Sequence, residues 1–355
     1  MTSRQVVLHG TLALAGLCAA YFTWQRGIEL APGEAFVVDS GKNELAQVRF
    51  EDQDKAQDKS KDKAQDKAQD KSQDKSTWVE LGRSSDDNGP FTEVRLSAQE
   101  KAAPVKDQPP TKTPERVVRG SDAADKLLAS FAPWRASRGL GVLDPSKLKD
   151  LGLDAPKKRI TLTLRNGKRT FALAPAPPGG SDPYVRDEAS GQVYVVARSF
   201  LSDFQTASSL LVERRLHGFK VEEADRVTIQ RGSKKKDFII SRGDDGIRLS
   251  PVATPDKPDA TAKTWHDRAF GLWPMDVLGK DETPTEGTPQ IDLRIEYSVR
   301  GRRLGFVEVA RVPAVATVTE GAKDTLFARS ERTLGWFRLG ADSQSVLTDA
   351  DGVLR

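Results

Sequence analysis

The sequence ITLTLRNGKRTFAL, residues 160–173, carries the clearest structural signal in this chain of 355 residues. Ile160 and Leu162 begin a run in which every second side chain is apolar, which is the period of a strand with one buried face. Asn166-Gly167 follows, and Asn-Gly between two such runs is a strong hairpin signal because both residues tolerate a positive φ. Phe171 lies on the returning run. The stretch therefore predicts an antiparallel hairpin.

Alternating apolar runs continue on both sides of this hairpin. Further strands are expected around Val48–Phe50, Thr77–Leu81, Thr92–Leu96, Tyr184–Val185, Val193–Val196, Val227–Ile229, Phe238–Ile240, Ile247–Leu249, Ile291–Ile295, Phe306–Val309, Leu326–Phe327 and Trp336–Phe337. Short helices are expected after Asp144-Pro145, a cap followed by a first-turn proline, and near Phe200–Phe204.

One longer helix is expected before the hairpin. Ser121 is a suitable N-cap, and Leu127, Phe131 and Trp134 share one helical face at i, i+4 and i+7. Pro133 lacks a backbone N–H, so this helix must kink or restart there.

Two distant segments share one pattern of aromatic strand, polar turn and aromatic strand. They read PYVRDEASGQVYVV at 183–196 and TLFARSERTLGWFRL at 325–339. Self-similarity of this kind indicates a duplicated unit. The expected fold class is α+β, a strand-rich ectodomain of two related antiparallel β/helix units after one N-terminal transmembrane helix.

The transmembrane helix is predicted at Val6–Trp24, a nearly uncharged segment long enough to cross a hydrocarbon core of roughly 30 Å. Arg4 is the only charged side chain before it, and Tyr21 and Trp24 are typical of an aromatic belt at the far interface. The short stub before the segment has no room for a domain. We therefore expect a single-pass anchor in the inner (cytoplasmic) membrane, with the C-terminal domain outside the cytoplasm.

Two other readings of this segment fit less well. A cleaved signal peptide needs a shorter apolar core and a small-x-small cleavage site, and the best small pair is Cys18 and Ala20. A lipoprotein needs a small residue before the lipidated cysteine, whereas Leu17 precedes Cys18. Cys18 is the sole cysteine, so no disulfide is expected in the exported part.

A low-complexity insert occupies Glu51–Ser76, which reads EDQDKAQDKSKDKAQDKAQDKSQDKS. In a helix this four-residue period would stack like charges at i, i+4, and no apolar face would offset the ordering entropy. We expect a disordered insert in the loop of a hairpin, with a charged single helix as the alternative. Ala102–Pro114 is a second, proline-rich flexible segment.

These features define the expected organisation of the chain. It comprises a cytoplasmic stub at 1–5, the anchor at 6–24, the start of the ectodomain at 25–50, the insert at 51–76, a first α+β unit at 77–216 with a Pro-rich linker at 102–114, and a second α+β unit at 217–355.

Composition and motifs favour a protein without catalytic chemistry. The net charge of +4 is a small excess of 55 basic over 51 acidic side chains, so no nucleic-acid partner is expected. No nucleophile elbow and no phosphate-binding loop occurs. His266 and Asp267 are neighbours whose side chains point apart, and we expect a surface or half-buried histidine there. We expect no catalytic residue, no cofactor and no metal, and therefore no enzyme.

Basic residues gather at three expected hairpin turns. They are Lys168 and Arg169; Lys234, Lys235 and Lys236; and Arg300, Arg302 and Arg303. If the turns point the same way, they form a patch for anionic lipid head groups or envelope glycans. The simpler interpretation is that solvated hairpin ends are commonly basic.

One family resemblance rests on three motifs. Gly152-Leu153 with Pro156, the turn Asn166-Gly167-Lys168, and the strand pair Tyr184-Val185 with Val193-Tyr194 resemble the bacterial family known as domain of unknown function 4340. Ala174-Pro175 departs from that pattern, in which a glycine usually follows the hairpin. The resemblance implies a single-span exported α+β protein that accompanies ATP-binding-cassette transporters related to gliding motility. It supplies no catalytic residues.

We therefore expect a membrane-anchored accessory or scaffold protein outside the cytoplasm, whose partner is an integral membrane or envelope complex. The alternative is a module that binds envelope glycan or anionic lipid through the basic turns. A hydrolase is a more distant third.

Overall fold

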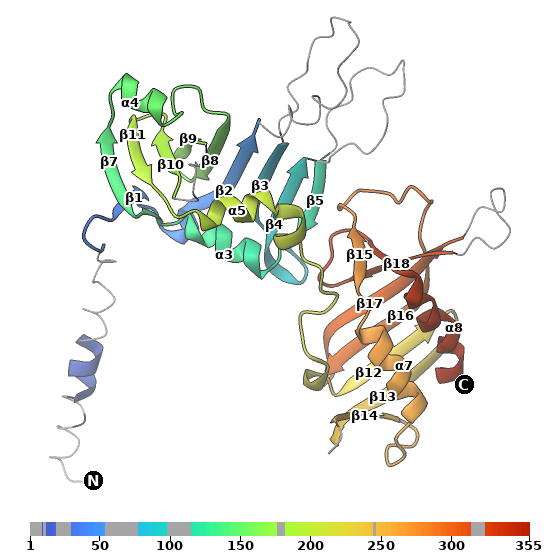
Figure 1. The fold of residues 1–355 in the computed structure, drawn as a ribbon. Coiled ribbons are helices and arrows are strands. Elements are labelled where there is room, and N and C mark those ends of the chain that lie inside the picture. Colours follow the sequence, from blue (N-terminus) through green and yellow to red (C-terminus); the bar gives the residue numbers. More distant parts are fainter. Residues whose placement is uncertain are drawn as a thin grey trace, which may run out of the picture.

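The computed structural model describes residue 9 and residues 12–18, 30–53, 77–97, 115–175, 182–243, 246–313 and 324–355. These residues form two large antiparallel sheets that lie side by side, with helices against one face of each (Figure 1). We call residues 35–210 the first unit, residues 211–220 the connecting segment and residues 221–355 the second unit. The α+β class with large antiparallel sheets is thus confirmed.

In the described part of the first unit, the main sheet has nine strands in the order β5-β4-β3-β2-β8-β9-β10-β11-β7. They are β2 (Leu45–Asp52), β3 (Thr77–Asp86), β4 (Gly89–Ser97), β5 (Glu115–Arg119), β7 (Arg138–Val142), β8 (Lys158–Leu164), β9 (Gly167–Leu173), β10 (Tyr184–Asp187) and β11 (Gln192–Val195). The short strands β1 (Ala35–Val38) and β6 (Trp134–Ala136) pair with each other. The helices are α3 (Asp122–Ser130), α4 (Pro145–Asp150), α5 (Ser199–Gln205) and α6 (Ala207–Leu210).

In the second unit, as far as it is described, the sheet has eight strands in the order β14-β13-β12-β16-β17-β18-β19-β15. They are β12 (Arg226–Arg231), β13 (Lys234–Gly243), β14 (Gly246–Pro251), β15 (Pro274–Val277), β16 (Gln290–Val299), β17 (Arg302–Val312), β18 (Thr325–Ser330) and β19 (Phe337–Leu339). Helices α7 (Ala260–Phe270) and α8 (Gln344–Val353) pack on each other in front of this sheet (Figure 1).

The two sheets follow the same path. If β5 is set aside, the first sheet reads β4-β3-β2-β8-β9-β10-β11-β7 and the second reads β14-β13-β12-β16-β17-β18-β19-β15. In both units three meandering strands precede a helix, an edge strand follows it, and a second meander completes the sheet. The shared pattern seen in the sequence therefore lies on equivalent strand pairs, β10–β11 and β18–β19.

The hairpin predicted from residues 160–173 is confirmed as β8–β9, with its turn one residue earlier than expected. Leu164 pairs with Gly167, so Arg165 and Asn166 are the loop residues. Gly167 has φ +139 and begins β9, a conformation that side chains rarely adopt.

The helix predicted after Ser121 is confirmed in its first part only. The Ser121 hydroxyl accepts a hydrogen bond from the Ala123 amide at 3.2 Å and so caps α3. The helix ends at Ser130, and the prediction that Trp134 continues it is wrong, because Trp134 begins β6. Pro133 supplies no amide to continue the helix. Trp134 instead packs edge-on against Phe171 of β9, with ring centroids 5.0 Å apart.

Aromatic side chains form the centre of both cores. In the first unit, Phe50 of β2 stacks on Phe204 of α5 with centroids 5.1 Å apart, which fixes the helix on this face. In the second unit, Trp265 of α7 is 1% exposed, and its indole N–H donates to the Val346 carbonyl of α8 at 2.9 Å. That bond ties the two helices of the second unit together.

The N-terminal anchor stays a prediction. Within Val6–Trp24 the structure describes His9 and residues 12–18, and these are helical. Across the described ranges, no helix combines the length and the apolar character needed to cross a membrane. Most of the insert and the whole of Ala102–Pro114 lie outside the described residues.

The start of the insert needs one correction. Glu51 and Asp52 are the last residues of β2, where they pair with Trp78 and Thr77 of β3. Asp52 is 2% exposed, and its carboxylate lies 3.5 Å from the Lys158 amine. The repeat therefore begins after Asp52, in the loop of the β2–β3 hairpin.

We expect residues 54–76 to be dispensable for folding. Their removal, with a two-residue Asn-Gly turn joining Gln53 to Thr77, shortens one loop and leaves every pair of β2 with β3 in place. Loop-closure entropy predicts that the free energy of unfolding stays constant or rises by on the order of 1 kcal/mol. Urea unfolding followed by tryptophan fluorescence measures it.

A matched deletion that also removes Glu51 and Asp52 should destabilise the protein, because it shortens β2 and takes away the carboxylate beside Lys158. Equal effects of the two deletions would contradict the assignment of these residues to the strand.

Candidate functional site

The connecting segment and the second unit meet the first unit along β5, the edge strand of its sheet. The Glu213 amide donates to the Arg119 carbonyl at 2.9 Å, and the Lys280 amide donates to the Val117 carbonyl at 2.8 Å. The outer side of β5 is therefore covered from two directions. We call this contact region the junction.

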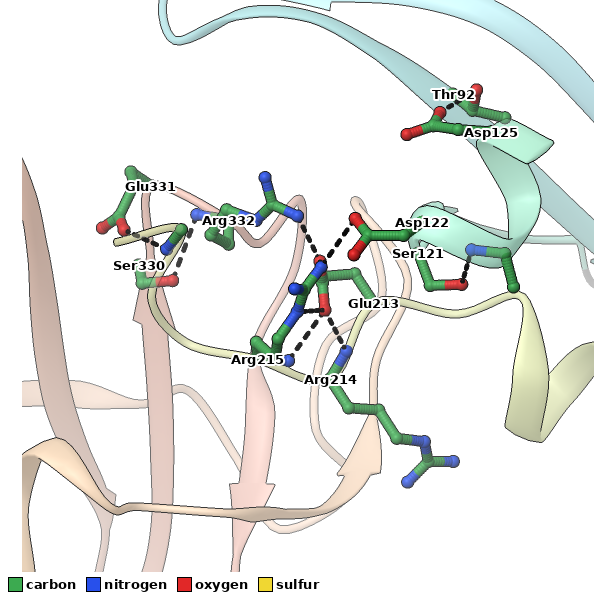
Figure 2. Close-up of polar contacts among 12 residues, drawn as sticks. Thr92, Ser121, Asp122, Asp125, Glu213, Arg214, Arg215, Ser330, Glu331 and Arg332 are labelled. Carbon is green, nitrogen blue, oxygen red and sulfur yellow. Dashed lines mark hydrogen bonds and ion pairs between the residues drawn. The ribbon is translucent and has the colours of Figure 1, made fainter. Parts of the chain in front are cut away.

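A buried carboxylate lies at the centre of the junction (Figure 2). Glu213 is 3% exposed and accepts hydrogen bonds from the backbone amides of Arg214 and Arg215, both at 3.0 Å. The Arg215 guanidinium binds the same carboxylate at 2.9–3.0 Å and reaches Asp122 at 2.8 Å. Arg332 of the second unit donates to it as well.

These contacts set the charge of Glu213. Burial alone raises its pKa, but the hydrogen bonds from Arg215 and then Arg332 outweigh burial and lower the pKa to about 2. Glu213 is thus ionised at any physiological pH. One carboxylate holds the connecting segment, the first turn of α3 and the second unit together.

The turn that carries Arg332 makes a second set of contacts. The Glu331 carboxylate accepts the Phe306 amide at 2.8 Å and the Gly218 amide at 3.4 Å. The Glu331 carbonyl accepts a hydrogen bond from the Asn88 side chain of the first unit at 3.3 Å. Burial raises the pKa of Glu331. This turn therefore connects the core of the second unit to the β3–β4 turn of the first.

Two glycines allow the chain to approach itself closely beside the junction. A Cβ on Gly335 would lie 2.3 Å from the Gly279 carbonyl oxygen and 2.5 Å from that of Leu278. A Cβ on Gly279 would lie 3.2 Å from the Val117 amide nitrogen. Backbone atoms cannot yield easily, so side chains at these positions would force the strands apart.

A groove of about 860 Å³ runs between the units next to these contacts. The first unit lines it with the ends of β2, β3 and β4, with Arg116 of β5, and with α5 and α6. The second unit lines it with Met275 and Asp276 of β15 and with the end of β19. Arg116 crosses between the units and pairs with Glu282 at 2.7 Å and with Asp276 at 3.5 Å.

The groove presents mixed chemistry. Its lining contains both acidic residues, Asp52 and Asp276, and basic residues, Arg116 and Arg338. Met275 is 69% exposed, and Trp273, just before β15, is 61% exposed. Apolar and paired polar groups in one surface are typical of protein contacts rather than of a site for one small ion.

Across the described ranges, no group of three or more His, Cys, Asp or Glu side chains is placed to hold a metal ion. The acidic groups of the groove include Asp276, which pairs with Arg116 at 3.5 Å.

The basic turns do not come together. Strand β12 is antiparallel to β16, with Gln230 opposite Arg294 and Arg226 opposite Ser298. The turn before Lys234 therefore lies at the start of β16, and the turn at Arg300 lies at its other end. At about 3.3 Å per residue, the length of β16 separates them by roughly 30 Å.

Several of the predicted contact residues serve the fold instead. The Lys236 amine donates to the carbonyls of Val353 and Arg355 at 2.9 and 3.0 Å. A positive charge at this place stabilises the C-terminal end of α8. Lys234 pairs with Asp351 of α8 at 3.3 Å. In the first unit, Arg169 pairs with buried Asp187 at 2.6 Å.

The remaining residues of the predicted set are exposed near the hairpin turns or lie against a ring. Lys168, Lys235 and Arg302 are exposed at the starts of β9, β13 and β17, and Arg300 is exposed in a turn. The Arg303 guanidinium lies 4.5 Å from the centre of the Phe306 ring.

The expectation of a surface or half-buried histidine at position 266 is wrong. His266 is 0% exposed because α7 turns it towards the sheet, where its Nε2 lies 3.1 Å from the Tyr297 hydroxyl. His217 of the connecting segment is also buried, at 9% exposure. Asp267 is exposed, but its carboxylate lies 3.9 Å from the His266 Nδ1, so the expectation that the two side chains point apart is wrong.

Sequence reasoning missed Glu213, Glu331 and Arg332. Glu213 lies in the stretch ERRLHGF, which has no period of its own, and its partner Arg332 is 119 residues away. The only available signal was a run of three charges next to apolar residues.

The fold places the chain among α+β proteins with large antiparallel sheets. Residues 114–269 match the model of the family described as Domain of unknown function (DUF4340), so the predicted resemblance is confirmed over that stretch. The match runs from β5 to α7 and includes the connecting segment. No curated protein and no solved structure matches the chain.

We expect Glu213→Gln to destabilise the protein by on the order of 3 kcal/mol, because it leaves the Arg332 and Arg215 guanidinium groups facing a neutral amide. Urea unfolding at pH 7 measures the loss. Because the folded pKa is lowered, the stability from Glu213 is present above pH 4.5 and is lost as pH falls towards 2; the variant should lack that part of the pH dependence.

Glu188→Gln is the matched control. Glu188 pairs with Arg159 at 3.0 Å within the first unit, and both side chains are about one-third exposed. A surface pair of this kind contributes less than about 1 kcal/mol. If both variants lost the same amount, Glu213 would have no special role at the junction.

Proposed function

We propose that this chain is a membrane-anchored accessory or scaffold protein of a membrane complex, acting outside the cytoplasm without catalysing a reaction. The partner suggested by the family resemblance is an ATP-binding-cassette transport system. The two units, which we propose arose by internal duplication, together present the groove at the junction.

The exposed apolar side chains beside the groove carry this proposal. Trp273 and Met275 are large, more than half exposed and two residues apart on or next to the edge strand β15. Burying such side chains is a main source of affinity between proteins. The mixed charges around them give a partner protein hydrogen bonds and ion pairs at the rim.

The buried ionisable groups fit a structural role. Glu213 is fully engaged by arginines and backbone amides, and Asp187 is held by Arg169 and by the turn that follows it. Catalytic groups need access to a substrate, whereas these are enclosed by the contacts that they make.

The alternative function, binding of envelope glycan or anionic lipid through the basic turns, has less support. Two of the turns lie at opposite ends of the second sheet, and Lys234, Lys236 and Arg169 have partners within the chain. A single basic face would need the turns to point the same way.

The proposed topology predicts where a C-terminal fusion works. A phosphatase that is active only outside the cytoplasm, fused after Arg355, should be active, and the purified chain should begin at or near Met1. Activity assays and N-terminal sequencing check the two statements. A mature N-terminus at Tyr21, or a lipid on Cys18, would contradict the anchor.

The proposed partner surface predicts site-selective crosslinking. A photoreactive amino acid at Met275 should give an adduct with a membrane protein in intact cells. Val142 is the matched control, because it lies on β7, the far edge of the first sheet, and is 67% exposed against 69% for Met275. Mass spectrometry identifies the adduct.

Equal adducts from both positions would show nonspecific contact and would contradict a partner surface at the groove. Adducts with lipid or glycan alone would favour the alternative function.

A further inference from the structure

We propose that two buried histidines, His217 of the connecting segment and His266 of the second unit, form an acid-sensitive element, which loosens the second unit and its contacts with the first unit on mild acidification. The inference does not depend on the proposed function. It rests on where His217 and His266 lie and on what surrounds them.

Both histidines pack against one phenylalanine. The His217 ring stacks on Phe270 with centroids 4.4 Å apart and planes 8° apart. The His266 ring lies 5.9 Å from the same Phe270, with planes 26° apart. The Tyr297 ring contacts both imidazoles, with its centroid 5.2 Å from that of His217 and 5.6 Å from that of His266. A proton on either ring would therefore bring a charge into an aromatic core.

Few groups face these rings to receive such a charge. His217 faces Glu331, with 3.9 Å between Nδ1 and Oε1, and neither of its ring nitrogens is within hydrogen-bond distance of a partner. Arg332, next to Glu331, is engaged with Glu213.

His266 is bonded through Nε2 to the Tyr297 hydroxyl, and its Nδ1 lies 3.9 Å from Asp267. Asp267 is in turn paired with Lys263 of the same helix at 2.5 Å. Asp267 thus has a lysine partner. Among the described residues, Glu331 is the buried carboxylate beside the two histidines that forms no salt bridge with a lysine or arginine.

The direction of the pH effect follows from burial. Burial, and then the charge of His266, lowers the pKa of His217 to about 4; burial, only partly offset by Asp267, lowers the pKa of His266 to about 4. An unfolded histidine titrates near 6.5. Between these values the unfolded chain binds more protons, so stability falls as pH falls from about 6.5 to 4.

The neighbouring titratable groups change this pH dependence of stability little. Burial raises the pKa of Tyr297, which stays neutral throughout. Burial raises the pKa of Glu331, so the folded chain takes up a proton there on acidification and gains stability, opposite to the effect of the histidines. This is one carboxyl group, whereas two imidazoles act in the destabilising direction. The chain has three histidines, and the third is His9, so no histidine of the first unit responds.

The junction is connected to this element through Glu331. The carboxylate that faces His217 belongs to Glu331, whose carbonyl accepts a hydrogen bond from Asn88 of the first unit. The next residue, Arg332, donates to Glu213. Rearrangement of this turn around a charged His217 therefore acts on both cross-unit contacts.

The test is thermal and urea unfolding of the full chain in detergent at pH 7.5 and pH 5. For the unaltered chain we expect the unfolding equilibrium constant to rise by about thirtyfold for each histidine, less the opposing effect of Glu331. His217→Phe and His266→Phe keep an aromatic ring in place, and each should remove about one such factor. His9→Gln is the matched control and should behave as the unaltered chain does.

A pH response that is absent, or unchanged in both phenylalanine variants, overturns the proposal. Should those variants not fold, hydrogen exchange of the unaltered chain, corrected for intrinsic rates, decides. Loss of protection at pH 5 confined to residues 217–355 and the β3–β4 turn supports the element, whereas equal loss in both units, or none, overturns it.

Discussion

The need to pair one buried carboxylate governs how the two units are arranged. An ionised side chain that is nearly excluded from water is tolerated only when charged and hydrogen-bonding partners surround it. Glu213 takes its partners from two places, namely its own segment, which includes Arg215 with its link to Asp122 of α3, and Arg332 of the second unit. These contacts tie the connecting segment to α3 of the first unit and to the second unit. The groove lies between the two units that they join.

Hairpins could be predicted from the sequence because their signal is local. The β8–β9 pair, the cap of α3 by Ser121 and the meander of the second sheet all follow from neighbours within a few residues. The family resemblance rested on the same local motifs, and the match extends it across the connecting segment to residue 269. Local consistency of this kind is what pattern reading detects.

The candidate site could not be predicted because its contacts are distant in sequence. Asn88 and Glu331 are 243 residues apart, and no period relates them. Composition misled at two places. Glu51 and Asp52 resemble the charged repeat, but pairing with β3 makes them part of a strand. His266 adjoins a charged residue, but its position on the inner side of α7 decides its burial.

The covering of β5 also bears on solubility. An open edge strand offers unpaired amides and carbonyls to which another chain can add, and this is a common route to aggregation. Here the carbonyls of Val117 and Arg119 are occupied by Lys280 and Glu213. The second unit thus shields the first from pairing with its own copies. The first unit made alone would present that edge to other molecules, so a soluble form of it would need a substitute for the shield, such as a charged or proline-bearing β5.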